Sequence, residues 1–142
     1  MIRDHINLIR GYHRVETLRE NAELDRLAQE HANQMAKQKK LFYVSSTYYG
    51  ILVWASYYPA ASVMVSKWYD ERSRYNFLLN SPKPGTQHLT QMLWKNTKSV
   101  GIGIARDCDF LYAALYFYPK GNIRGQYRTN VFNKRSNCFG RK

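Results

Sequence analysis

The sequence predicts an α+β fold, with helices on both faces of a mostly antiparallel sheet. Apolar residues recur at helical spacing over the first 40 residues, whereas the pattern in 51–55, 100–104 and 110–118 is that of strands. A short turn joins the last two segments, so they form an antiparallel pair. The length of 142 residues suits a single domain, assigned to residues 1–132, followed by a basic tail at 133–142.

Apolar spacing predicts the first two helices. In residues 2–14 one face carries Ile2, Ile6, Ile9 and His13. In residues 22–39 the face is longer and carries Leu24, Leu27, Ala28, His31, Ala32, Met35 and Ala36. Asn21 is the expected N-cap of the second helix, and its lysines at the end suit the helix dipole.

The middle of the chain changes from extended to helical structure. Residues 41–58 lose the helical period, and a strand is predicted around 51–55. Pro59 then opens a third helix over about 60–77, whose inward face includes both Trp68 and Glu71. A carboxylate on an apolar face needs a polar partner. The alternative is a Glu at the edge of that face, bonded to backbone or to a tyrosine hydroxyl.

The C-terminal half predicts a loop, a helical turn and a β-hairpin. After the loop at 79–85, Leu89, Met92 and Leu93 pack inward from the helical turn. In the strand that follows, apolar residues alternate with Ser99, Gly101 and Gly103, and this thin face allows a close neighbour. Pro119, Gly121 and Asn122 form a turn after the hairpin, and residues 123–132 are expected to add an edge segment.

The charge favours acidic partners. The formal net charge is +12, which attracts anionic lipid, sulfated glycan or nucleic acid, although a merely solvated basic surface is the alternative reading. The basic residues are spread along the chain and make no helical stripe, so no specific nucleic-acid partner is expected. Apolar residues make up 44%, with 12 tyrosines, which excludes a disordered chain.

The sequence contains neither a transmembrane segment nor a recognisable signal peptide, and it has two cysteines. No apolar run reaches the roughly 20 residues needed to cross a bilayer, so a transmembrane protein is not expected. The first ten residues, MIRDHINLIR, lack the apolar core of a signal peptide. Cys108 and Cys138 are compatible with one disulfide between hairpin and tail or with two free thiols, so the redox compartment stays open.

Two motifs in order give the chain a family resemblance. HLTQMLWKNTKSVGIGIA at 88–105 and YFYPKGN at 116–122 resemble the two signatures of the CAP superfamily, named for cysteine-rich secretory proteins, antigen 5 and pathogenesis-related 1. HINLIRGYH, LDRLAQEHANQMA, LVWAS and WYDERSRYNF are similar to its earlier segments. The resemblance covers about residues 5–131 and is greatest to the small Golgi-associated plant pathogenesis-related type. It implies a three-layer α-β-α sandwich.

The resemblance also implies a central cavity, which in this family carries two His and two Glu and holds a divalent metal in several members. Glu71 and His88 match one of each. Gly50 stands where the second Glu is expected, and no His lies within 41–45. Zinc normally needs three or four protein ligands, so we expect no bound metal and no cofactor. Among the signature residues, Gln91, Trp94 and Asn122 are expected near the cavity.

Binding without catalysis is the function that the resemblance implies. The chain is expected to bind lipid or sterol, or an acidic membrane surface, through its degenerate cavity and its basic charge. The candidate lipid-facing aromatics are Tyr48, Tyr49, Trp54, Tyr57 and Tyr58. The alternative interpretation is that they are ordinary core and surface residues with no role in lipid binding. Cys108 lies far along a strand from His88, and no nucleophile elbow surrounds Ser45 or Ser46, so no enzyme is expected.

Two other functions and two compartments remain open at this stage. The first alternative function is a protein-interaction module, a homodimer or a receptor-directed domain, that holds no small ligand. The second is a degenerate metal-binding protein of the same family. Most of the family is exported, which implies an extracellular protein whose start lacks its signal peptide. The missing signal peptide and the low cysteine count favour the alternative, a cytosolic protein at the membrane periphery.

Overall fold

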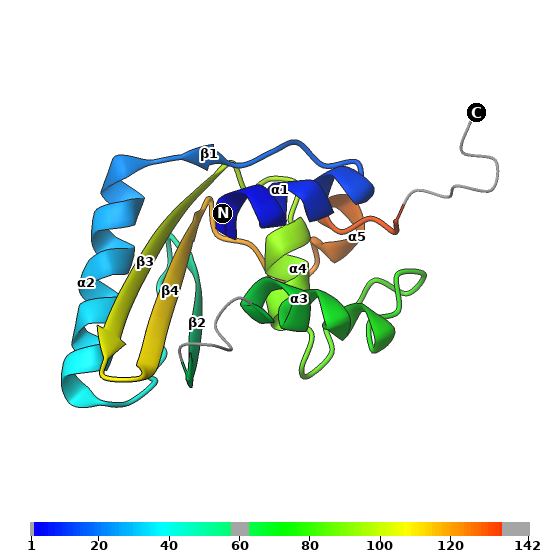
Figure 1. Ribbon diagram of the computed structural model, residues 1–142. Helices are drawn as coiled ribbons and strands as arrows, with labels where there is room; N and C mark the ends of the chain where they lie inside the picture. Colours follow the sequence, from blue (N-terminus) through cyan, green and yellow to red (C-terminus); the bar gives the residue numbers. More distant parts are fainter. Residues whose placement is uncertain (1, 58–62, 135–142) are drawn as a thin grey trace.

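Helices on both faces of a four-stranded sheet form this protein (Figure 1). The computed structural model describes residues 2–57 and 63–134. In chain order the elements are α1 (Ile2–Tyr12), β1 (Arg19–Glu20), α2 (Ala22–Gln38), β2 (Gly50–Tyr57), α3 (Met64–Tyr69), the 3-10 turn η2 (Asp70–Ser73), α4 (Gln87–Leu93), β3 (Ser99–Asp107), β4 (Phe110–Tyr118) and α5 (Tyr127–Asn130).

The sheet has the strand order β1-β3-β4-β2. β3 and β4 form the predicted hairpin, in register from Ser99 opposite Tyr118 to Asp107 opposite Phe110. β2 runs antiparallel to β4, whereas the two-residue β1 runs parallel to β3 at the edge. The α+β class and the three-layer arrangement are therefore confirmed, with a sheet that is mixed at one edge.

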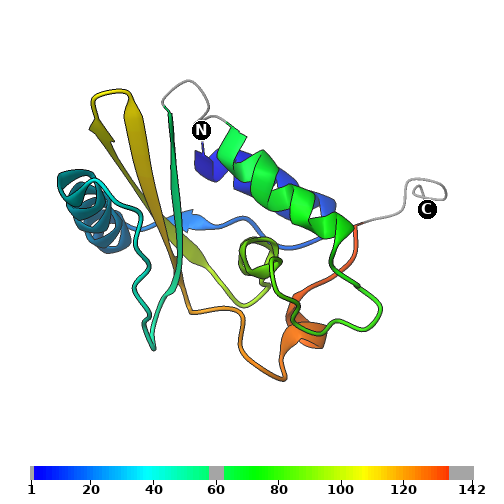
Figure 2. The same ribbon diagram turned by 90° about the horizontal axis from the view of Figure 1, so that it is seen from below.

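Helix α2 covers one face of the sheet, and α1, α3 and α4 cover the other, as Figure 2 shows. α2 lies close to β3 because Gly101 and Gly103 present no side chain there. A Cβ at Gly101 would overlap the backbone at Leu24 and Asp25, so this contact requires glycine. The Asn21 cap is confirmed, because its side chain accepts a hydrogen bond from the N–H of Leu24 at 3.0 Å.

Each face of the sheet has its own hydrophobic cluster. On the α2 face the buried members are Leu24, Ala28, Ala32, Met35, Ile51, Tyr112, Ala114 and Tyr116. On the other face the larger cluster joins α1, α3, α4 and the alternate residues of the strands, among them Ile6, Ile9, Trp68, Leu89, Met92, Leu115 and Phe117. Both clusters follow from the strand period of two, which sends neighbouring side chains to opposite faces.

Several predicted boundaries are wrong. Residues 123–132 contain the short helix α5 and add no strand, and β1 forms the sheet edge instead. Two residues are too few to show a strand period, so no pattern in the sequence indicated β1. The third helix is regular only over Met64–Tyr69 before it tightens into η2, while residues 58–62 lie outside the described part of the chain. α1 ends at Tyr12, two residues early, before Arg14 adopts a left-handed φ of 63°.

The ends and the cysteines add little to the described fold. No helix within residues 2–57 and 63–134 is long and apolar enough to cross a membrane. Cys108 is exposed at the tip of the β3–β4 hairpin. Cys138 and most of the predicted basic tail at 133–142 lie outside the described residues, so the predicted disulfide and the tail stay predictions.

Candidate functional site

A cavity of about 250 Å³ lies between the start of β2, helix α4 and the turn after β4. Its polar lining comes from Tyr43, Gln87, His88, Gln91, Lys120 and Asn122. The remaining lining residues are Gly121 and four consecutive residues of β2. In the part of the chain that the structure describes, no carboxylate is among the lining side chains, whereas one lysine and one histidine are.

Glu71 lies behind the His88 that lines this cavity, in direct contact with it although 17 residues separate the two. His88 Nδ1 donates to Glu71 Oε2 at 2.8 Å, and the N–H of Leu89 donates to Oε1 at 2.9 Å. The ring of Trp68 stacks on the imidazole at 5.0 Å between centroids. Both oxygens of the buried carboxylate are therefore already engaged by donors, one from a side chain and one from the backbone.

At Gly50, where the family resemblance led us to expect a second carboxylate, the side chain of Gln91 occupies the space. A Cβ added at Gly50 would overlap the side-chain amide of Gln91. That amide is fixed, because it donates to Thr97 Oγ1 at 3.1 Å and accepts from the N–H of Gly121 at 3.0 Å. Gln91, a signature residue that the resemblance led us to expect near the cavity, is buried and lies at the cavity wall.

The other two signature residues have different surroundings. Asn122 lines the cavity in a left-handed conformation, with φ 56°. It accepts a hydrogen bond from Thr90 at 2.6 Å and donates one to the carbonyl of Gln87 at 3.0 Å, which ties the turn to α4. Trp94 does not line the cavity, because its ring is buried in the core edge-on to Tyr127.

Two of the five candidate aromatics share one surface groove. Tyr48 and Tyr49 lie together, and the ring of Tyr49 is 5.9 Å from that of Tyr118. With Asn21 and Glu23 at the start of α2 they line an open groove of about 350 Å³. This groove is separate from the cavity at His88, since the two share no lining residue.

The remaining candidate aromatics lie elsewhere, so the five do not form one wall. Trp54 packs edge-on against Trp68 on the opposite face of the sheet. Tyr57 lies at the far end of β2, edge-on to Phe110. Tyr58 lies outside the described residues.

Lys120 is the charged residue of the cavity that the sequence patterns did not single out, and Tyr43 and Gln87 are polar lining residues that they also missed. Lys120 lies in the YFYPKGN motif, and its Nζ donates to the backbone carbonyl of Ser46 at 2.5 Å. The hydroxyl of Ser46 in turn accepts from the N–H groups of Tyr48 and Tyr49. Lys120 therefore joins the cavity to the segment before β2. The motif position alone could have pointed to it, because the resemblance already placed Asn122 at the cavity.

Two other histidines are buried structural residues. His13 and His31 each lie between a tyrosine hydroxyl, of Tyr69 and Tyr116 respectively, and a backbone carbonyl. Burial lowers the pKa of His13, because a charged imidazole loses its hydration there. The helical spacing placed both rings inward, but it could not name their partners.

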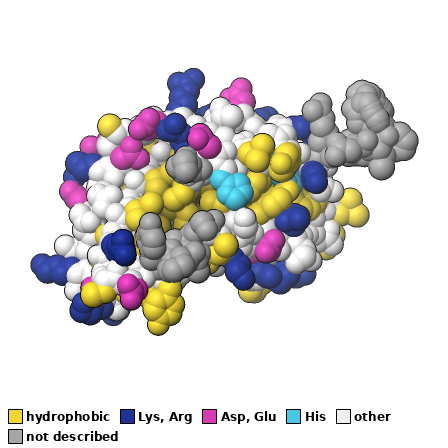
Figure 3. All heavy atoms as spheres, viewed as in Figure 1, with side chains coloured by type: hydrophobic (Ala, Val, Ile, Leu, Met, Phe, Trp, Pro, Cys, Tyr) yellow, Lys and Arg dark blue, Asp and Glu magenta, His cyan; other side chains and the backbone are white. Residues whose placement is uncertain are grey.

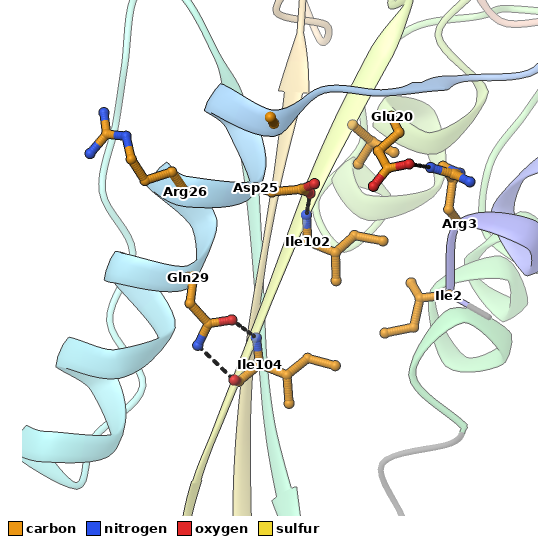
Figure 4. Close-up of a pocket in the computed structure, with 10 residues that line it drawn as sticks. Ile2, Arg3, Glu20, Asp25, Arg26, Gln29, Ile102 and Ile104 are labelled. Carbon is orange, nitrogen blue, oxygen red and sulfur yellow. Dashed lines mark hydrogen bonds and ion pairs between the residues drawn. The ribbon is translucent and has the colours of Figure 1, made fainter.

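A larger, open groove of about 630 Å³ follows the outer edge of β3 (Figure 4). Asp25 accepts from the N–H of Ile102 at 2.9 Å, and Gln29 bonds both the N–H and the carbonyl of Ile104. These α2 side chains occupy the backbone groups that another strand would use. The groove is thus a protected sheet edge, without titratable groups converging on an enclosed site.

Within residues 2–57 and 63–134, Cys108 lies far from His88 and no cluster of metal ligands is formed. Cys108 lies at the hairpin tip, whereas His88 lies beside the other end of the sheet, and nine strand residues span roughly 30 Å. The described residues contain no group of three or more His, Cys, Asp or Glu side chains placed to hold a metal. One ring nitrogen with no free carboxylate does not fit zinc, which takes three or four ligands.

Comparisons with known proteins agree with this fold. The sequence profile of the cysteine-rich secretory protein family, CAP, matches residues 3–119. Among curated relatives, human Golgi-associated plant pathogenesis-related protein 1 is 33% identical over 132 residues, which are 88% of this chain and 86% of that protein.

Solved structures share the architecture at lower identity. BmVAL-1 has a TM-score of 0.71 at 20% identity and covers 94% of this chain and 84% of its own. NaASP2, solved with Zn2+, has a TM-score of 0.65 at 20% identity, over 85% of this chain and 69% of its own. From the profile match and the human relative together, the chain belongs to the cysteine-rich secretory protein (CAP) family.

Proposed function

We propose that this protein is a non-enzymatic CAP domain that docks on anionic membrane surfaces through residues 37–48, which we term the docking segment. One observation carries the proposal: exposed apolar side chains lie beside unpaired lysines in a single short segment. Leu41, Tyr43, Val44 and Tyr48 are 48%, 63%, 42% and 69% exposed. Such a cluster suits the boundary between headgroups and acyl chains, where apolar and cationic groups are both accommodated.

The lysines supply the electrostatic part. Lys37 and Lys40 are exposed and make no ion pair with any described residue, whereas Lys39 is bound to Asp107 at 2.9 Å. Each lysine near an anionic surface contributes about 1 kcal/mol. The net charge of +12 adds long-range attraction. Figure 3 shows Lys and Arg side chains spread around one face of the molecule without a stripe.

The docking segment is held in shape before it meets a membrane. Lys120 bonds the carbonyl of Ser46, and the Ser46 hydroxyl bonds the two N–H groups that follow. The ring of Phe42 stacks on His31 at 5.0 Å and anchors the start of the segment. Docking therefore orders little backbone, which lowers its entropic cost.

Surface docking fits the molecule better than an internal sterol. The cavity of about 250 Å³ is smaller than the roughly 300–1,000 Å³ of sites that enclose drug-sized ligands. Its lining is also polar on the α4 side. The docking segment instead offers exposed apolar groups beside unpaired lysines, and it includes Tyr48 from the predicted lipid-facing set.

Flotation with vesicles of phosphatidylcholine, alone or with phosphatidylserine, tests the proposal. Binding is expected only with the anionic lipid and to weaken with salt. The double variant Lys37→Gln/Lys40→Gln is expected to bind roughly 25-fold more weakly, since about 2 kcal/mol is removed. Lys67→Gln/Lys98→Gln removes the same charge from exposed lysines elsewhere and is the matched control. Equal loss in the two double variants, or no binding to anionic vesicles at low salt, would refute docking through this segment.

A protein-interaction module is the second candidate, favoured by a different surface. Leu78 and Leu79, in the loop before α4, are 85% and 65% exposed and adjacent. Such residues are common at protein interfaces. Light scattering after size exclusion distinguishes this function: a dimer that Leu78→Ser/Leu79→Ser converts to monomer, without loss of vesicle binding, would support it.

The compartment follows from the membrane proposal. Anionic lipid is concentrated in the cytoplasmic leaflet, so docking favours a membrane-peripheral protein over an exported one. The name of the human relative, a Golgi-associated protein, also supports a membrane-peripheral location. Fractionation of cells that express the full protein tests this, and recovery only in the medium would contradict it.

A further inference from the structure

The geometry points to a phosphate-binding site in the cavity, with Lys120 as its cationic anchor and His88 Nε2 as its second contact. The inference goes beyond membrane docking and does not need it, because free phosphate in solution reaches the same cavity. It starts from a disagreement: the family resemblance implies a cation site here, and the residues present do not fit one.

The charges that line the cavity favour an anionic ligand over a cation. Among the described residues, Lys120 is the one lysine or arginine that lines the cavity, and no carboxylate lines it. Glu71 lies behind His88 with both oxygens occupied, by the imidazole and by the N–H of Leu89. A metal cation would meet an ammonium group and find no free carboxylate, whereas an oxyanion would meet a cation with spare N–H donors.

His88 favours phosphate over a simple carboxylate. Its Nδ1 is bound to Glu71, and its Nε2 has no hydrogen-bond partner among residues 2–57 and 63–134. The ring is held by Trp68, so Nε2 keeps a fixed direction. A phosphate monoanion carries P–OH and P–O⁻ groups together, so it can donate its proton to Nε2 or accept one from it. A carboxylate at neutral pH offers only acceptors.

The cavity also has the size and the wall for such a group. About 250 Å³ exceeds the space of one phosphate and leaves room for a small organic substituent. The backbone of Gly121 is held to the wall by Gln91, which keeps that side fixed. The mouth adjoins the docking segment, since Tyr43 lines the cavity and Lys120 bonds Ser46. The phosphate could therefore come from solution or from a lipid headgroup.

Titration of the whole protein with inorganic phosphate tests the site. We expect one-to-one binding by calorimetry, accompanied by a shift of the His88 Nε2 resonance in ¹⁵N NMR. Lys120→Gln is expected to bind about tenfold more weakly, because one charge-assisted hydrogen bond is lost. Lys120→Arg keeps the charge and is expected to retain binding, which separates charge from any local rearrangement at Ser46. Lys98→Gln removes an exposed lysine elsewhere and is expected to bind normally.

Three results would overturn the inference. The first is a His88 resonance that does not move at about 50 mM phosphate, a concentration far above a Kd in the millimolar range. The second is phosphate binding that Lys98→Gln and Lys120→Gln weaken equally. The third is acetate that binds as tightly as phosphate. Vesicles then identify the source of the ligand. If phosphatidic acid, but not phosphatidylserine, competes with free phosphate at His88, the site holds a headgroup. If neither competes while free phosphate binds, it holds a soluble phosphate compound. Failure of vesicle docking alone leaves the phosphate site standing.

Discussion

Arg10 makes a buried clamp whose removal has a predictable cost. Its side chain is 1% exposed, and it donates from Nε to the carbonyl of Glu16 at 2.7 Å. Nη1 donates to Met92 and Trp94 at 2.8 and 3.0 Å, and Nη2 donates to Thr97 at 3.1 Å. Burial lowers the pKa of Arg10 to about 10, so it remains charged at neutral pH. The guanidinium thereby satisfies four backbone carbonyls, three at the end of α4 and just after it and one in the loop after α1.

Arg10→Met keeps the length of the side chain and leaves those carbonyls without donors. Each orphaned buried group costs about 1–3 kcal/mol, partly relieved by relaxation, so we expect a loss of roughly 3–5 kcal/mol in the free energy of unfolding. For a domain of this size the melting temperature should fall by roughly 10–20 °C. Arg26→Met is the control, since Arg26 is exposed in its pairs with Glu23 and Glu30 and its loss should cost far less than the loss of Arg10.

Urea unfolding followed by tryptophan fluorescence measures both variants. Arg10→Lys adds a second comparison, because one ammonium group cannot reach four carbonyls and should recover only part of the loss. The reasoning fails if Arg10→Met costs less than about 1 kcal/mol or no more than Arg26→Met, since buried carbonyls would then not need the guanidinium.

Other parts of the molecule give three further tests. Gly101→Ala should destabilise by about 1–3 kcal/mol because its Cβ meets the α2 backbone, whereas Gly11→Ala, in open space within α1, should stabilise by about 0.5–1 kcal/mol in the same urea assay. His13 has a lowered pKa, so the folded state resists its protonation; stability is full above the unfolded pKa of 6.5 and falls as the pH drops below it. His13→Gln should flatten the fall in melting temperature between pH 7.5 and 5.5, and an unchanged slope would contradict this. Equimolar Zn2+ should leave the melting temperature of the protein unchanged, and metal analysis after desalting should find no zinc. Zinc bound at a one-to-one ratio would contradict the ligand count.

Much of the fold could be predicted from short-range patterns. α2 is recognisable because its apolar face repeats over four turns, and β3 because apolar residues alternate with glycine. In contrast, β1 has two residues and gains its strand conformation only from hydrogen bonds to β3. The break between α3 and η2 was equally hidden, because the apolar spacing from Trp68 to Glu71 suits both an α-helix and a 3-10 turn.

The candidate site divides in the same way. The sequence by itself determined the chemical groups: one imidazole at His88, one inward carboxylate at Glu71, a glycine where another carboxylate was expected, and a strongly basic chain. Tertiary structure alone decided which atoms of those groups remain free. Both carboxylate oxygens of Glu71 accept hydrogen bonds from residues 17 and 18 positions later in the chain. Lys120 lies at the cavity in a turn that contacts Ser46, 74 positions earlier. Such contacts depend on how distant segments pack, and no local period encodes them.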